Sequence, residues 1–97
     1  MTWREGVGVK MVMQGNLDMK TVPPLYAIGL KHLASEDLHV DFSRVEAVDS
    51  AAVSMLLGWE RAAQRGHRNL HLVGLPADLL SLARLYGVDD MLPRQSA

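Results

Sequence analysis

Cysteine is absent from the 97 residues of this chain. Disulfide frameworks, thiolate catalysis and cysteine-based zinc or iron–sulfur sites are therefore excluded. The charges nearly balance, with 10 basic against 11 acidic residues and a formal net charge of −1, so no overall field attracts a nucleic acid. A hydrophobic fraction of 48% beside 22% charged residues is typical of a folded domain. We expect a single domain over residues 1–97.

Long apolar runs are also absent. The most apolar stretch, Ala51–Trp59, is far shorter than the roughly 20 residues that a membrane-spanning helix requires. The N-terminus has neither the basic stretch nor the apolar core of a secretory signal. We therefore expect a cytoplasmic protein that has no direct membrane insertion and contacts a membrane only through a partner.

The sequence has no recognisable motif for catalysis, metal binding or nucleotide hydrolysis. No GxxxxGK(S/T) phosphate loop occurs. Asp18 and Asp49 have no histidine or nucleophile near them in sequence, so turn and helix-cap roles explain them better than acid–base catalysis does. Metal-ligand spacing is missing from the four histidines, which are His32, His39, His67 and His71. We expect no enzyme activity, no metal site and no cofactor.

Hydrophobic periodicity predicts alternating strands and helices. Alternation indicates strands at residues 7–14 and 38–43, and a further strand is expected at 69–74. Three helices are expected: one that begins at Pro23-Pro24 and ends near Ser35, one from Asp49-Ser50 to Gly66, and one over 76–86 that ends before Gly87. A short strand over Thr2–Arg4 would pair antiparallel with the first long strand. The predicted class is α/β, with a mixed, mostly parallel sheet of about four to five strands and helices packed on it.

Three segments, in this order and at this spacing, resemble the STAS family. They are Gly15-Asn16-Leu17-Asp18, Val40-Asp41-Phe42-Ser43 and Val48-Asp49-Ser50-Ala51-Ala52. The closing stretch Leu79–Gly87 also looks like the end of that family, so the resemblance covers nearly the whole chain. It implies a STAS-like fold and a module that binds other proteins without chemistry of its own.

Two branches of the STAS family offer different functions. In anti-sigma factor antagonists a kinase phosphorylates a serine or threonine two positions after the helix-starting aspartate, but that position is Ala51 here. Ser50 is the hydroxyl that remains, and therefore the candidate phosphorylation site. The order of Asp49, a hydroxyl residue and two small residues is instead similar to the MlaB-like STAS subunit of the Mla phospholipid ABC transporter, as is the tail Leu82–Val88.

The second resemblance implies a specific partner. The subunit would bind and regulate the ATPase of an ABC transporter, in a complex with a membrane permease at the inner face of the inner membrane. Such a system moves phospholipids and maintains outer-membrane lipid asymmetry. The hydroxyl residue needed for activity in that family is carried over to Ser50.

The predicted partner-binding surface lies at the start of the central helix. Either Ser50 or Asp49 caps the helix, a role worth roughly 0.5–2 kcal/mol, and small neighbours would let a partner approach the Ser50 hydroxyl. Met55 and Trp59 share one helical face. They either pack in the core or form a binding surface, with Trp59 as the anchor. The predicted set is Ser50, Ala51, Ala52, Ser54, Met55 and Trp59.

Two other functional classes stay open. The chain would alternatively be an anti-sigma factor antagonist that binds a serine kinase acting as an anti-sigma factor. A small enzyme ranks last, because nothing in the sequence brings its aspartate and histidine residues into a catalytic pattern.

Overall fold

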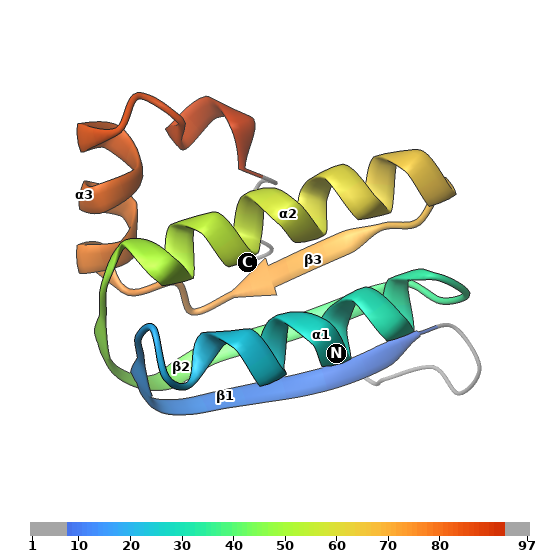
Figure 1. Cartoon of the computed structure of the whole chain (residues 1–97), viewed down its shortest axis with the longest axis horizontal. Coiled ribbons are helices and arrows are strands. Elements are labelled where there is room, and N and C mark those ends of the chain that lie inside the picture. The colour runs from blue at the N-terminus through green and yellow to red at the C-terminus, as the bar shows by residue number, and fades with distance from the viewer. Residues whose placement is uncertain (1–7, 93–97) are drawn as a thin grey trace.

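A parallel three-stranded sheet is the centre of the computed structural model, which describes residues 8–92. The strands lie in chain order across the sheet (Figure 1) and are β1 (Val9–Leu17), β2 (Leu38–Val48) and β3 (Leu70–Val73). The helices are α1 (Val22–Leu33), α2 (Ser50–Gly66), α3 (Ala77–Leu85) and a 3-10 turn, η1 (Asp89–Met91). The predicted α/β class with helices on a mainly parallel sheet is confirmed. The predicted strand Thr2–Arg4 lies outside the described residues.

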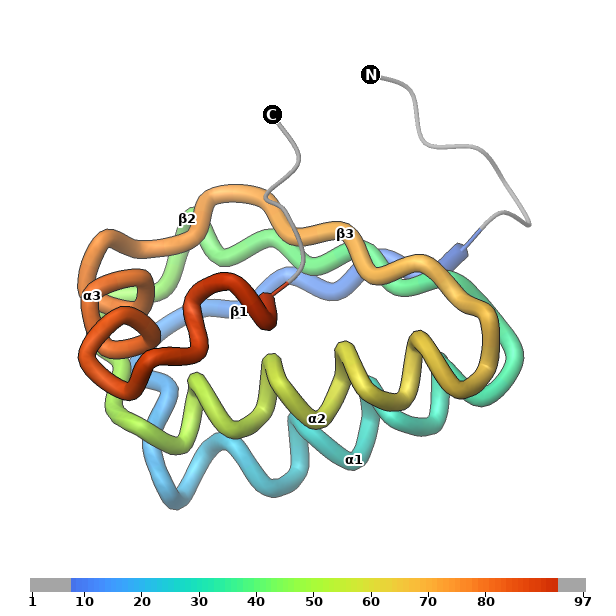
Figure 2. The backbone as a smooth tube through the Cα atoms, turned by 90° about the horizontal axis from the view of Figure 1, so that it is seen from above, coloured from blue at the N-terminus to red at the C-terminus, as the bar shows by residue number. Residues whose placement is uncertain are grey.

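Helices α1 and α2 lie side by side on one face of the sheet, whereas α3 lies at one end of it (Figure 2). The core between the layers takes alternate residues of β2, namely Leu38, Val40 and Phe42. Helix α2 contacts α1, α3 and β3, which explains why apolar residues occupy more of its circumference than one buried face requires. Within residues 8–92, no helix has both the length and the apolar character that spanning a bilayer requires.

Two β-bulges shift the pairing register between β1 and β2. The first strand has nine residues and the second eleven, and their register shifts once after Val12 and once after Gly15. Each shift places one extra residue in β2, so the side chains that follow change faces. Phe42 is buried in the core, Val45 packs against it after the first bulge, and Val48 packs against it after the second. The last residues of the two strands, Leu17 and Val48, therefore both face the core.

Glycines allow α1 and α2 to pack closely. The backbone of Gly29 in α1 lies against the indole of Trp59, and an added Cβ atom would overlap that ring. Gly58 in α2 receives the phenol of Tyr26 in the same way. The Trp59 indole Nε1 donates a hydrogen bond to the backbone oxygen of Tyr26 at 3.0 Å. Each helix thus receives an aromatic side chain from the other.

Candidate partner-docking surface

The start of α2 is capped by Asp49. This residue has extended backbone angles, φ −127° and ψ −170°, and its Oδ1 accepts a hydrogen bond from the backbone N–H of Ala51 at 2.7 Å. Of the two capping residues that the sequence allowed, the structure assigns the cap to Asp49. Ser50 is the first residue of the helix, and its side chain is exposed.

The turn between β1 and α1 is ordered by Asp18. Its Oδ1 accepts hydrogen bonds from the backbone N–H groups of Lys20 and Thr21 at 2.9 and 3.0 Å. The Thr21 hydroxyl in turn donates to the backbone oxygen of Asn16 at 2.8 Å. The hydrogen bonds from Thr21 and Lys20 lower the pKa of the Asp18 carboxyl. This network fixes the turn that carries Met19.

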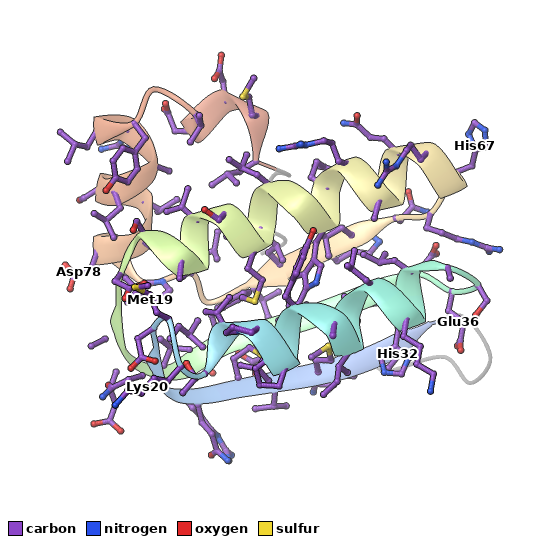
Figure 3. All side chains as sticks on the ribbon, viewed as in Figure 1. Met19, Lys20, His32, Glu36, His67 and Asp78 are labelled. Atoms are coloured by element: carbon purple, nitrogen blue, oxygen red, sulfur yellow. The ribbon has the colours of Figure 1, made fainter. Side chains whose placement is uncertain are left out.

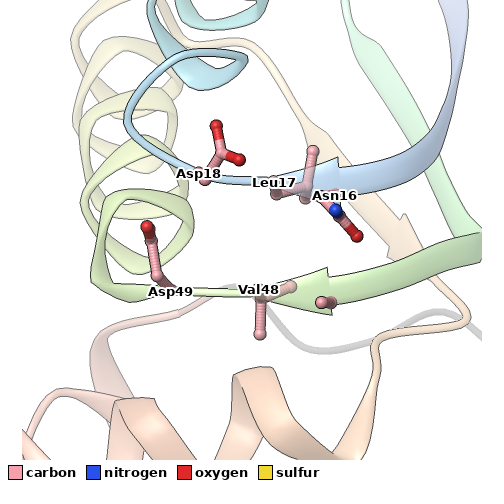
Figure 4. Close-up of a pocket in the computed structure, with 6 residues that line it drawn as sticks. Asn16, Leu17, Asp18, Val48 and Asp49 are labelled. Atoms are coloured by element: carbon pink, nitrogen blue, oxygen red, sulfur yellow. The ribbon is translucent and has the colours of Figure 1, made fainter.

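The Asp18 turn and the Asp49 cap lie side by side because β1 and β2 run parallel. Leu17 pairs with Val48 at the strand ends, and Asp49 N–H donates to the Leu17 oxygen at 3.1 Å. A shallow pocket of about 200 Å³ lies between the two segments (Figure 4). Both carboxylates accept backbone hydrogen bonds, as turn and cap residues do. In residues 8–92 no three potential metal ligands come together.

An apolar groove of about 490 Å³ lies between the first turns of α1 and α2. Met19 lies at its rim, where α2 begins (Figure 3), and is 78% exposed. Among residues 8–92 no charged side chain lines the groove; the lining residues are Met19, Val22, Pro23, Tyr26, Ala51, Ser54 and Met55. This surface therefore suits an apolar segment of another molecule.

The structure divides the predicted partner-binding set into surface and core residues. Ser50 and Ser54 are exposed and Ala51 is half-buried, so these three are available to a partner. Ala52 is buried, and Met55 is buried except where it lines the groove.

Trp59 lies in the core and not on the candidate surface. It is 0% exposed and packs against Gly29, so its predicted role as an interface anchor is corrected to that of a core residue. Its polar N–H bonds within the fold, as a buried indole requires.

Met19 and Tyr26 were not predicted to belong to the surface. A signal for Tyr26 was present, because isolated glycines inside helical patterns, such as Gly29 and Gly58, indicate close packing of a neighbour. The sequence does not say which aromatic side chain each glycine receives. Met19 gave no signal, because a methionine in a turn has no periodicity.

The fold is that of a STAS domain. The family described as “Mlab, STAS domain” matches residues 2–93, and the chain belongs to that family. STAS proteins of this kind are generally binding proteins without catalytic activity.

Similar proteins fall in both predicted branches. The intermembrane phospholipid transport system binding protein MlaB of Escherichia coli K12 is 28% identical over 95 residues, which cover 97% of this chain and 96% of that protein. The anti-sigma-B factor antagonist of Staphylococcus epidermidis is 26% identical over 80 residues, which cover 80% of this chain and 74% of that protein.

A solved structure has the same fold. The anti-sigma factor antagonist SpoIIAA in its unphosphorylated form superposes with a TM-score of 0.70 at 17% identity, covering 91% of this chain and 81% of that one.

Proposed function

We propose that residues 1–97 form a single STAS subunit that binds and stabilises the ATPase of an Mla-type ABC transporter for phospholipids. The subunit has no catalytic role. It lies at the inner face of the inner membrane because the ATPase and its permease hold it there, and it supports outer-membrane lipid asymmetry. The observation that carries the proposal is the similarity to MlaB over 97% of the chain, joined to an exposed Ser50 at the start of α2.

The local geometry supports a protein partner. Asp49 supplies the helix cap, so the Ser50 hydroxyl is not needed for that bond. The small side chain of Ala51 and the exposed Ser54 leave room for a partner's backbone along the first turns of α2. The adjoining groove adds an apolar surface, whose lining residues in the described part of the chain carry no charge. A helical region of the ATPase, presenting apolar side chains, matches these features.

Binding of this kind would act on the ATPase through its conformational equilibrium. A partner that binds only the assembled, competent state of the ATPase stabilises that state by mass action. No residue of the STAS subunit needs to reach the nucleotide.

The test is an affinity pull-down with tagged wild-type chain and its Ser50→Arg variant from the native cell extract, followed by mass spectrometry. The large charged side chain at Ser50 should reduce recovery of an ABC ATPase and its permease at least about tenfold, because it fills the approach to α2. Ser35→Arg is the matched control, since Ser35 is exposed in the turn after α1 and should leave recovery unchanged. Equal recovery with Ser50→Arg, in a chain still folded by circular dichroism, contradicts the proposal.

An anti-sigma factor antagonist is the second candidate, favoured by the Staphylococcus epidermidis relative. Incubation with the serine kinase and labelled ATP separates the two functions. An antagonist would take up one phosphate per chain, lost in Ser50→Ala, and would bind the kinase in the pull-down. A transporter subunit would take up none.

A further inference from the structure

The phenol of Tyr26 separates the apolar groove from the contact between α1 and α2. An added Cβ atom on Gly58 would meet Tyr26 Cε1 at 2.6 Å and Cζ at 2.7 Å, and the hydroxyl oxygen closer still. The ring therefore lies directly on the glycine backbone. It also lines the groove, together with Ser54 one turn earlier on α2.

The backbone that carries this ring is held in place by Trp59. The buried indole donates its N–H to the Tyr26 oxygen at 3.0 Å and lies against Gly29. Space on the Trp59 side is filled, because that side chain is fully buried. A Tyr26 ring that is lifted from Gly58 therefore moves away from the Trp59 side and toward the groove, which it already lines.

We infer that Gly58 is a positioning residue: because it receives the Tyr26 phenol, the groove stays open for an apolar segment of the ATPase. The absence of a side chain at Gly58 allows the phenol to lie close against α2, and the groove then accepts the partner's apolar side chains. The inference rests on the proposed function for the identity of the partner. Whether the groove is open depends only on residues of this chain and can be tested without a partner.

The first test is Gly58→Ala. The added methyl group must displace the phenol, which is half-buried and at the end of a flexible side chain, so the fold survives. Binding to the purified ATPase should weaken at least about tenfold, while circular dichroism and Tm stay near wild type. Gly66→Ala is the matched control on the same helix, because its Cβ would meet nothing closer than 3.5 Å. A Gly58→Ala chain that binds normally, or that does not fold, overturns the inference.

The second test is a double-mutant cycle with Tyr26→Ala. Without the phenol, a methyl group at Gly58 displaces nothing. Adding Gly58→Ala to Tyr26→Ala should therefore change ATPase binding less than about twofold, whereas the same change in the wild type costs at least about tenfold. A merely structural defect from Gly58→Ala would appear equally in both backgrounds, and that outcome overturns the inference.

A third readout needs no partner and so separates the inference from the proposed function. The chain has no cysteine, so Ser54→Cys places a single thiol beside the groove. In the Gly58→Ala background, the displaced phenol should slow the reaction of this thiol with a maleimide reagent several-fold, and Tyr26→Ala should restore the rate. Unchanged labelling overturns the inference, even where the ATPase still binds. If the wild type binds no ATPase but labelling follows this pattern, only the proposed partner is wrong.

Discussion

Asp49 supplies the N-terminal cap of α2, so Ser50 is not needed for that role. Its carboxylate caps α2 through the hydrogen bond to Ala51 N–H, and Ser50 follows as an exposed helical residue. We expect Asp49→Ala to lower the free energy of unfolding by about 1 kcal/mol, because a backbone N–H loses its partner. Asp49→Ser should lose less, since a hydroxyl oxygen can accept the same bond. Urea denaturation followed by circular dichroism measures both. If Ser50→Ala destabilises the chain more than Asp49→Ala does, the cap assignment is wrong.

Trp59 contributes both volume and a hydrogen bond. We expect Trp59→Phe to lower the free energy of unfolding by about 2 kcal/mol, because it removes buried ring atoms and the bond to the Tyr26 oxygen. Unfolding should be followed by circular dichroism, since the variant lacks the indole. An effect below about 0.5 kcal/mol would mean that the indole is not packed as described.

The helix pair α1 and α2 depends on Gly29 more strictly than on Gly58. At Gly29 the neighbour is a fully buried indole that has no free space, so a methyl group cannot be accommodated by moving one exposed ring. We expect Gly29→Ala to destabilise the chain by about 2 kcal/mol or more, despite the better helix propensity of alanine. Thermal unfolding of Gly29→Ala, Gly58→Ala and the Gly66→Ala control should rank Gly29→Ala lowest. Equal Tm values would contradict this packing.

Local pattern predicted most elements, and tertiary packing explains what it missed. The alternation in β2 predicts a strand only as far as Ser43, because the bulges break the period that identifies a strand, although the strand continues to Val48. The capped start and the end of α2 at Gly66 were predicted, since caps and glycines act locally. The burial of Trp59 could not be distinguished from exposure, because only the fold shows that Gly29 of another helix receives it.

At the scale of the whole molecule, a histidine pair links stability to pH. His39 of β2 and His71 of β3 are paired in the sheet register, and their rings stack with centroids 4.4 Å apart. Burial and the neighbouring His71 lower the pKa of His39, with Asp37 acting in the opposite direction. Lys10 of β1, paired with His39 in the register, adds another positive charge on the same row of the sheet.

The sign of the pH effect follows from this shift. Because the folded pKa of His39 lies below its usual value of 6.5, the unfolded chain binds more protons just below that pH. The stabilisation is fully present above about pH 6.5 and is lost as the pH falls through the lowered pKa. Urea denaturation at about pH 7.5 and 5.5 should show lower stability at the acidic pH, and His39→Asn should reduce that difference. An unchanged difference in His39→Asn would exclude this pair as the cause.

The two bulges in β2 together keep the end of the strand facing the core, because each adds one residue to β2. With one extra residue alone, the side chain of Val48 would point to the face of the sheet away from the core. With two extra residues it points to the core, beside its pairing partner Leu17. Removing a single residue between Phe42 and Val48 would therefore reverse the facing of the segment that leads into Asp49, and removing two would preserve it. Length changes in this part of the chain should be tolerated in even numbers, and the position of the α2 start depends on that count.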